Sequence, residues 1–456
     1  MDVTQPTLAN FLQHLRTNKE LFILRRDAAP PQWSDEALHR SNYDQNPELY
    51  ALLAVMATIQ PWQRVRILFQ LLQGSRKGMS NEVRGTLERT TNLLLAVLHP
   101  DQVLTVFLAL RRVRANNKHT TKAILKYIFN HPHFEDMASC RRPTLVDCLE
   151  HALGKNVARA CAKMLSEEVT VNEAYLRRNV LRYVRNLQRV KFILPFLYNQ
   201  GTHQTGNGQY QLAHRQYTET FEQRQERPKT ITATNRGDIS ATLVHLYRGG
   251  NSPDLQRALD GYVEEAAGEL PRFEGKLALV LDASASTRSY GEREYCALSQ
   301  AVALQRVLEK RCANLQVHTV GGSGNPPMPE GNTDLATALL DALESEPDVV
   351  AIATDGYENV YPGDLERVVE SLPGAGIQTP VVFCHSKFTS SDDLTLRRPA
   401  QNLPQLEFWH QDDFEDVLLS LFLMANGKGA SDCLREFLVE KLTKVEKEVA
   451  PWTTIN

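Results

Sequence analysis

The stretch LALVLDASAST, residues 277–287, decides how the C-terminal part of this chain is interpreted. It begins as an unbroken apolar run, which is typical of a strand buried on both faces of a parallel sheet. It ends with one carboxylate and two hydroxyls at alternate positions, Asp282, Ser284 and Ser286. In a doubly wound sheet, ligands bind beyond the carboxyl ends of the strands, and that is where we expect these three side chains.

The alternation of apolar strands and helices continues to about residue 425. We expect further strands at 314–322, 348–356 and 379–386, and a strand or turn at 405–411. Helical patterns lie between and after them, at 294–312, 332–345, 362–372 and 414–424. Buried strands that alternate with helices predict an α/β doubly wound, Rossmann-like domain with a parallel sheet covered on both faces. A final amphipathic helix, about 431–448, follows a glycine-rich break.

Two other segments place oxygen ligands at the same edge of the predicted sheet. Thr333 lies in a loop at the start of the helical segment 332–345, and Asp355 stands just beyond the apolar run of the segment 348–356. No histidine accompanies the hydroxyls of Ser284 and Ser286, so a nucleophilic triad is excluded. A set of carboxylate and hydroxyl oxygens suits a hard divalent cation such as Mg²⁺. The alternative is that these residues only cap the turns between strands and helices.

The order Asp-x-Ser-x-Ser, then Thr, then Asp resembles the metal-ion-dependent adhesion site of von Willebrand factor A domains over about residues 275–425. The resemblance implies Mg²⁺ or Mn²⁺, with Ser284, Ser286 and Thr333 as direct ligands and Asp282 and Asp355 as water-mediated ones. It also implies an open coordination position for an acidic residue of a partner protein. Family members usually carry Met or another bulky residue after the second serine, whereas this chain has Thr287.

The sequence pattern predicts one helix after another in the first part of the chain. Apolar-periodic segments lie at 47–59, 61–73, 90–100, 101–113 and 120–130. Pro47, Pro61 and Pro143 stand where helices are expected to begin, because the first helical position tolerates a missing N–H. Successive short helices predict an all-α, HEAT-like solenoid or ring, although no strict repeat period is present.

Five segments follow from these patterns. They are a helical domain at 1–198, a polar loop or partly mobile segment at 199–237, returning helices and a junction at 238–274, the von Willebrand factor A domain at 275–425, and a C-terminal helix and tail at 426–456. The polar segment contains too little apolar material for a core of its own.

Charge separates the two halves of the chain. Residues 1–275 carry a net charge of +9 and residues 276–456 a net charge of −12, within a total of −3. A basic part joined to an acidic part suggests that the basic part contacts a polyanion.

The basic residues gather in two stretches that contain no acidic residue. The first holds Arg111, Arg112, Arg114, Lys118, Lys122 and Lys126; the second holds Arg177, Arg178, Arg182, Arg185, Arg189 and Lys191. Helical spacing places Arg178, Arg182, Arg185 and Arg189 on one stripe, opposite an apolar face. Solvated helix faces usually mix both signs, so these stretches suggest a surface that follows nucleic-acid phosphates. The alternative is a contact with the acidic domain of the same chain or with another protein.

Composition excludes several classes of protein. No segment approaches the length of apolar sequence that spans a bilayer, and no secretory signal is recognisable at the start. Seven cysteines without a C-x-x-C pair predict reduced thiols in a cytoplasmic protein.

Cys384 and His385 are adjacent along a strand and therefore point to opposite faces, which disfavours a catalytic pair. The glycine-rich stretch 321–327 lacks the lysine of a phosphate-binding loop.

A helical N-terminal region joined to a C-terminal von Willebrand factor A domain resembles the TROVE family of Ro ribonucleoprotein autoantigens and their bacterial relatives. The stretch from Leu255 to Ser286 looks like the junction in bacterial members. The resemblance implies a non-enzymatic RNA-binding scaffold for small non-coding or single-stranded RNA. The alternative is a protein-only adaptor, because von Willebrand A domains also work with AAA+ ATPases of the MoxR type.

Overall fold

The computed structural model describes residues 8–24, 33–56, 58–166, 172–198, 238–250, 252–388, 398–425 and 430–453. The polar segment expected at 199–237 lies outside the described residues. The chain divides into two compact units: a helical unit, Asn10–Glu226 with Leu438–Asn456, and a sheet unit, Met1–Ala9 with Arg227–Phe437. The division falls inside the last helix.

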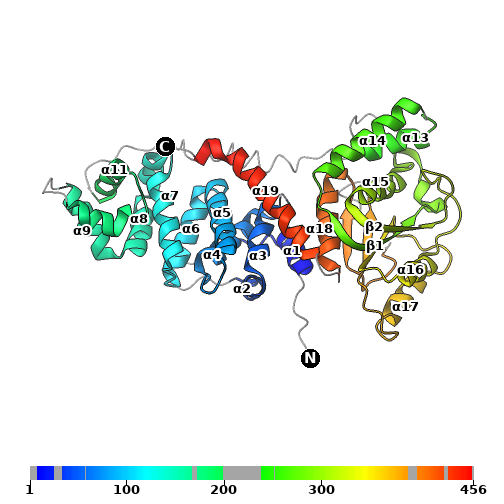
Figure 1. The fold of residues 1–456 in the computed structure, drawn as a ribbon, viewed down its shortest axis with the longest axis horizontal. Helices are drawn as coiled ribbons and strands as arrows, with labels where there is room; N and C mark the ends of the chain where they lie inside the picture. Colours follow the sequence, from blue (N-terminus) through cyan, green and yellow to red (C-terminus); the bar gives the residue numbers. More distant parts are fainter. Residues whose placement is uncertain are drawn as a thin grey trace. The chain divides into compact units, whose positions relative to one another are not determined.

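The helical unit contains consecutive helices, each packed on neighbours in the chain. Their bounds are α1 (Leu8–Thr17), α2 (Glu36–Gln45), α3 (Pro47–Leu52), α4 (Pro61–Gln73), α5 (Asn81–Val97), α6 (Pro100–Arg112), α7 (Lys118–Asn130), α8 (Phe134–Leu153), α9 (Lys155–Ser166), α10 (Glu173–Leu176) and α11 (Leu187–Tyr198). α4 packs on α5 and α6, α7 on α8, and α9 on α8 and α11. Figure 1 shows α2 and α3 towards one end of this unit and α9 and α11 at the other, with α4 to α8 between them.

Prolines and capping side chains set the helix starts, as the sequence predicted for Pro47 and Pro61. Asn46 caps α3 by accepting from the backbone N–H of Leu49 at 3.0 Å. Pro143 instead lies inside α8, two residues after a break in helical geometry at Arg141. Proline cannot continue the hydrogen-bond ladder of the preceding turn, so its presence just after the break agrees with a new helical segment starting there.

The sheet unit is built on five parallel strands, and it confirms the predicted α/β domain. The strands are β1 (Phe273–Asp282), β2 (Cys312–Val320), β3 (Val349–Thr354), β4 (Val381–Ser386) and β5 (Gln405–Phe408), in the order β2-β1-β3-β4-β5. The connecting helices are α15 (Cys296–Arg311), α16 (Leu335–Glu344), α17 (Asp364–Ser371) and α18 (Phe414–Met424). β1 has β2 on one side and β3 on the other, so the strand order reverses between β1 and β3.

Helices cover both faces of this sheet, which explains the apolar runs at the centre of its inner strands. Ala278 and Val280 of β1 pack in one core with Leu339 of α16 and Leu365 of α17. On the other side of the sheet, α15 and α18 pack against the strands (Figure 1), and Phe273 stacks on Phe422 of α18 with ring centroids 4.7 Å apart.

Segments outside the predicted 275–425 domain join one unit or the other. α13 (Ile239–Tyr247) and α14 (Pro253–Gly268) pack on α15, so residues 238–268 belong with the sheet. The last helix, α19 (Ala430–Thr453), is longer than predicted, and from Leu438 onward it belongs to the helical unit, where Glu446 pairs with Arg89 of α5 at 2.6 Å. Among the described residues, no helix is long and apolar enough to cross a membrane.

Candidate functional site

The carboxyl edge of the sheet brings together the oxygen side chains that the sequence singled out. β1 ends at Asp282, and the strand order reverses beside it. The loops after β1 and β3 therefore diverge at this point and leave space for a ligand between them. The loop after β2 carries Thr333 to the same place, just before α16.

Three hydroxyls form a chain of hydrogen bonds at this edge. Thr333 Oγ1 lies 2.7 Å from Ser284 Oγ, which lies 3.0 Å from Ser286 Oγ. Ser284 and Thr333 are fully buried, and Ser286 is partly exposed. The arrangement therefore presents oxygens from two loops to one point that opens towards solvent at Ser286.

Asp282 is a buried carboxylate that pairs with no cationic side chain among the described residues. It is completely buried, and burial raises the pKa of its carboxyl group. Its Oδ2 accepts from Thr354 Oγ1 at 2.6 Å, and its Oδ1 accepts from the backbone N–H of Ser284 at 3.0 Å. Within the described part of the chain, no lysine, arginine or histidine pairs with it. A divalent cation beside the three hydroxyls would supply the missing positive charge, so the donor set fits Mg²⁺ or Mn²⁺.

Asp355 follows β3 and is also nearly buried, at 7% exposure. Its Oδ1 accepts from the backbone N–H of Tyr357 at 3.1 Å, which fixes the carboxylate in the turn after the strand. All five predicted metal-site residues, Asp282, Ser284, Ser286, Thr333 and Asp355, thus stand at the carboxyl ends of strands or in the loops that follow them.

Two residues that no sequence pattern singled out hold this edge in place. Thr354 orients Asp282, and the side-chain amide of Asn359 donates to Thr333 Oγ1 at 3.2 Å. Both flank Asp355 in the stretch TDGYEN, so proximity to a predicted ligand was the available signal.

The first of the two glycines that follow β2, Gly321, occupies a position that only glycine fits. Its φ of +63° is in the left-handed region. A Cβ on this residue would lie 2.4 Å from the carbonyl oxygen of Glu330 and 3.0 Å from the Cα of Ser284. The glycine therefore lets the loop after β2 pack closely against the loop that carries the serines.

The second candidate site is a basic pocket in the helical unit. It has a volume of about 630 Å³ and brings together side chains from both basic stretches. Lys122 and Lys126 come from α7, while Arg182, Arg185 and Arg189 come from the segment before α11 and its first turn. No carboxylate is among the described residues that line the pocket.

The predicted arginine stripe is wrong as a helical feature. α10 ends at Leu176, Arg177–Leu181 form a π-helical turn, and α11 starts only at Leu187. Arg178, Arg182, Arg185 and Arg189 therefore do not lie along one helix, and Arg178 does not line the pocket. Leu176 and Val180 are both fully buried, as the apolar face predicted, but the chain leaves helical geometry after Leu181, so the arginines beyond it do not continue that periodicity.

Charge pairing divides the predicted cations into two groups. Arg111 pairs with Asp147 of α8 at 2.5 Å, Lys122 with Glu88 of α5, and Arg177 with Glu173 at 3.5 Å. These stretches lack acidic residues in the sequence but acquire them from neighbouring segments in the fold. Among the described residues, no carboxylate pairs with Lys126, Arg182 or Arg185.

Cationic side chains lie close to one another around the pocket. Burial and the charge of Lys122 lower the pKa of Lys126, and Arg185 lowers it further, although Glu88 acts in the opposite direction. Arg182 lies 4.5 Å from the ring centre of Tyr183. Arg189 is held by the backbone carbonyls of Phe129 and His131, at 3.2 and 2.9 Å. The pocket therefore has a rigid cationic base and exposed cations at its opening.

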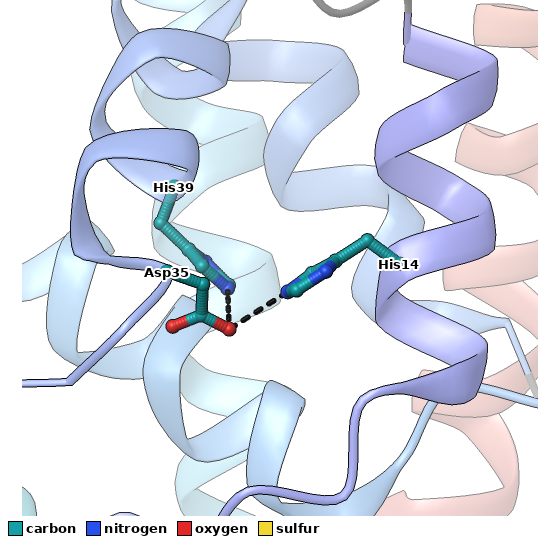
Figure 2. Close-up of side chains that lie close together, drawn as sticks. All are labelled: His14, Asp35 and His39. Carbon is teal, nitrogen blue, oxygen red and sulfur yellow. Dashed lines mark hydrogen bonds and ion pairs between the residues drawn. The ribbon is translucent and has the colours of Figure 1, made fainter.

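A cluster that the sequence analysis did not single out lies in α1 and α2. Figure 2 shows His14 and His39 both pointing at one carboxylate oxygen of Asp35, whose Oδ2 is 2.7 Å from His14 Nε2 and 3.8 Å from His39 Nε2. Histidine and carboxylate ligands in this number are typical of zinc sites. Separations of 21 and 4 residues along the chain gave no motif from which to recognise it.

The surroundings of this cluster argue against a metal. The guanidinium of the fully buried Arg66 contacts the same Asp35 oxygen that both histidines face. His39 already uses both ring nitrogens, with Tyr50 Oη and Gln63 Oε1, each at 2.8 Å. A cation would have to displace Arg66 from a buried ion pair, so the cluster is a polar network that joins α1, α2 and α4.

Cys384 shows no sign of catalytic activation. It is completely buried in β4, and burial raises the pKa of its thiol to about 12. A thiol with this pKa is protonated at neutral pH and is a poor nucleophile.

Neither a family model nor a curated protein matches the chain. Among solved structures, the chain is similar to the Ro (RSR) protein of Deinococcus radiodurans, with 11% sequence identity, coverage of 96% of this chain and 99% of that chain, and a TM-score of 0.37. At this identity and TM-score, function does not follow from the match and has to come from the chain's own residues.

Proposed function

We propose that this protein is a non-enzymatic RNA-binding scaffold. Its helical unit holds small non-coding or single-stranded RNA by the phosphates, and its sheet unit binds a protein partner through a divalent metal ion, Mg²⁺ or Mn²⁺. The observation that carries the RNA proposal is the basic pocket, where five cationic side chains from two distant segments surround a recess of about 630 Å³.

The pocket favours a single strand over a duplex. Its volume lies within the range of pockets that hold small ligands, about 300–1,000 Å³. One nucleotide of an extended strand can enter such a recess, whereas a duplex keeps its bases stacked inside. The Arg182–Tyr183 stack offers a planar surface for a base, and Lys126 and Arg185 are placed to contact phosphates.

Filter binding of an unstructured RNA oligonucleotide across a salt series tests this proposal. Each phosphate contact contributes about −0.7 to the slope of log K against log[salt] for a single strand. The double variant Arg182→Gln/Arg185→Gln should flatten the slope by about 1.4 and weaken binding similarly for all RNA sequences. The matched control is Arg40→Gln/Arg257→Gln, which removes two exposed arginines outside the pocket.

The control should bind like wild type. Equal slopes for the pocket variant and wild type would remove the basis for RNA binding. A protein-only adaptor that works with a MoxR-type ATPase would then be the better interpretation.

The metal proposal rests on the uncompensated charge of Asp282. Ser284, Ser286 and Thr333 would hold the ion directly, and Asp282 and Asp355 would hold it through water. A bound divalent ion with one open position supplies an attachment point for a carboxylate. Calorimetry should detect Mg²⁺ binding to wild type and to Asp341→Asn, a control on the exposed side of α16, and none to Asp282→Asn. Unchanged binding to Asp282→Asn would contradict the site.

A further inference from the structure

Large apolar side chains are exposed on the loops around the proposed metal site. Tyr290 is 88% exposed and Tyr361 60%, and Met328 and Tyr357 are exposed by 44% and 39%. These four residues, which we call the aromatic rim, are half of the eight large hydrophobic side chains that are this exposed among the described residues. Such a concentration on one part of a surface is typical of an interaction site.

The aromatic rim and the proposed ligands share the same three loops. Tyr290 follows Ser284 and Ser286 after β1, Met328 precedes Thr333 after β2, and Tyr357 and Tyr361 follow Asp355 after β3. Since β1, β2 and β3 are parallel neighbours, all three loops leave the same edge of the sheet.

Backbone hydrogen bonds lock two of these loops together. The N–H of Ala285 donates to the carbonyl of Gly331 at 3.1 Å, and the N–H of Glu330 donates to the carbonyl of Ala283 at 3.1 Å. The apolar side chains are thus presented on a preorganised frame beside the ligands, which reduces the entropy lost when a partner binds.

The charge of the same loops limits which class of partner can bind there. Residues 283–295, 321–334 and 355–363 contain two arginines and six acidic residues. The basic residues are Arg288 and Arg293, and Arg288 already pairs with Glu294 at 3.2 Å. Arg248 and Arg306 also contact these loops, at Glu294 and Asn325, but the carboxylates still outnumber the cations, which disfavours a polyanion such as RNA. A single carboxylate can approach it only when a metal ion offsets the acidic surroundings.

We propose that this edge binds an extended segment of another protein that carries one carboxylate flanked by apolar side chains. The carboxylate reaches the metal ion, and the flanking side chains pack on Tyr290 and Tyr361. This inference rests on the proposed metal site and adds the specificity of its partner. Aromatic residues dominate interface energetics because they bury a large area at a low cost in side-chain entropy.

A random peptide display library, selected on the full-length protein in Mg²⁺, tests the inference. The enriched peptides should contain Asp or Glu next to Leu, Ile, Phe or Trp, and EDTA should release them. A synthetic peptide of the enriched type should bind Tyr290→Ser/Tyr361→Ser about tenfold more weakly than wild type. Leu340→Ser is the matched control, since Leu340 is 47% exposed on α16 outside the aromatic rim, and it should bind like wild type.

Measuring how much Mg²⁺ stabilises each of these variants distinguishes a failure of the aromatic rim from a failure of the metal site. If Tyr290→Ser/Tyr361→Ser still gains stability from Mg²⁺ but binds the peptide like wild type, the aromatic rim is excluded and the metal site stands. If wild type gains nothing from Mg²⁺, both fail. Selection of peptides that lack a carboxylate, or binding of an RNA oligonucleotide at this edge, also overturns the inference.

Discussion

Two buried aspartates, one in each unit, show what distinguishes a candidate ion site from a structural network. Asp35 is 5% exposed and Asp282 is completely buried. Burial tends to raise the pKa of Asp35, but the hydrogen bond from His14 and the charges of His39 and Arg66 lower it to about 2. The pKa of Asp282 is raised, because burial is opposed only by hydrogen bonds from Thr354 and Ser284.

The difference lies in compensation and not in the number of potential ligands. His14, Asp35 and His39 resemble a zinc site by proximity, yet Arg66 already supplies the positive charge. Among the described residues, Asp282 belongs to no cluster of histidine, cysteine and carboxylate ligands, and no cationic side chain pairs with it. The buried group that lacks a partner is therefore the better indication of a bound ion.

The largest effect is expected at the compensated aspartate. Arg66→Leu leaves Asp35 buried without its guanidinium partner, so the helices around it should lose about 3–5 kcal/mol of stability. Hydrogen exchange of α2 and α4 in the full-length protein measures this loss locally. The double variant Asp35→Asn/Arg66→Leu should recover part of it. A loss below about 1 kcal/mol for Arg66→Leu would show that Arg66 does not compensate Asp35.

The uncompensated aspartate should respond in the opposite way. Without metal, Asp282→Asn should change stability by less than about 1 kcal/mol, because the substitution removes a buried charge and keeps an acceptor for the N–H of Ser284. Mg²⁺ at about 100 times its dissociation constant should stabilise wild type by about 2.7 kcal/mol and Asp282→Asn not at all. Thermal unfolding with and without Mg²⁺ measures both effects. Equal gains in the two proteins would place the ion elsewhere.

A third buried aspartate extends this comparison, because its cationic partner is a histidine, which can lose its proton. Asp238, which caps α13, lies 2.9 Å from His410 Nε2. Burial disfavours the charged imidazole, but hydrogen bonds to Asp238 and Asp412 outweigh it and raise the pKa of His410 to about 9.

Because the folded-state pKa of His410 is above its unfolded value, the pair stabilises the fold fully below pH of about 6.5. That contribution should be lost as the pH rises through about 9. We expect a loss on the order of 1–2 kcal/mol, since Asp412 is half exposed and its charge is screened. Melting temperatures from pH 6 to pH 10 should fall for wild type and stay flatter for His410→Gln. Parallel curves would exclude this pair as the cause.

The smallest effect is expected at an exposed pair beside the basic pocket. Glu88 pairs with Lys122, and both side chains are about 40% exposed. Glu88→Gln should change stability by less than about 0.5 kcal/mol. It should free Lys122 for a phosphate, strengthen RNA binding two- to threefold and steepen the salt slope by about 0.7. Filter binding across a salt series decides this, and unchanged affinity would show that Lys122 takes no part.

The sheet unit was predictable because its signals are local. The inner strands contain short apolar runs, and the predicted aspartates come directly after such runs, Asp282 as the last residue of β1 and Asp355 as the residue after β3. Parallel strands have all their carboxyl ends at one edge, so knowing the strands suffices to place the loop residues together. Thr354 was missed because its role is to orient another side chain, and sequence spacing carries no sign of that.

The basic pocket was only half predictable. The sequence identifies both basic stretches, but not that Lys126 and Arg185 lie at one recess or that Glu88 and Asp147 neutralise Lys122 and Arg111. The helical periodicity through Arg178 and Arg189 also suggested a continuous helix that the fold does not contain.

The sequence by itself thus determined the α/β domain, the helical character of the first part, and the oxygen side chains at the strand ends, because strand periodicity and βα connections act over a few residues. Tertiary structure alone decided which charges are compensated. Arg66 compensates Asp35 and Glu88 compensates Lys122, whereas among the described residues no cationic side chain compensates Asp282. Compensation depends on distances between segments far apart in the chain, and burial then decides how strongly each charge requires a partner.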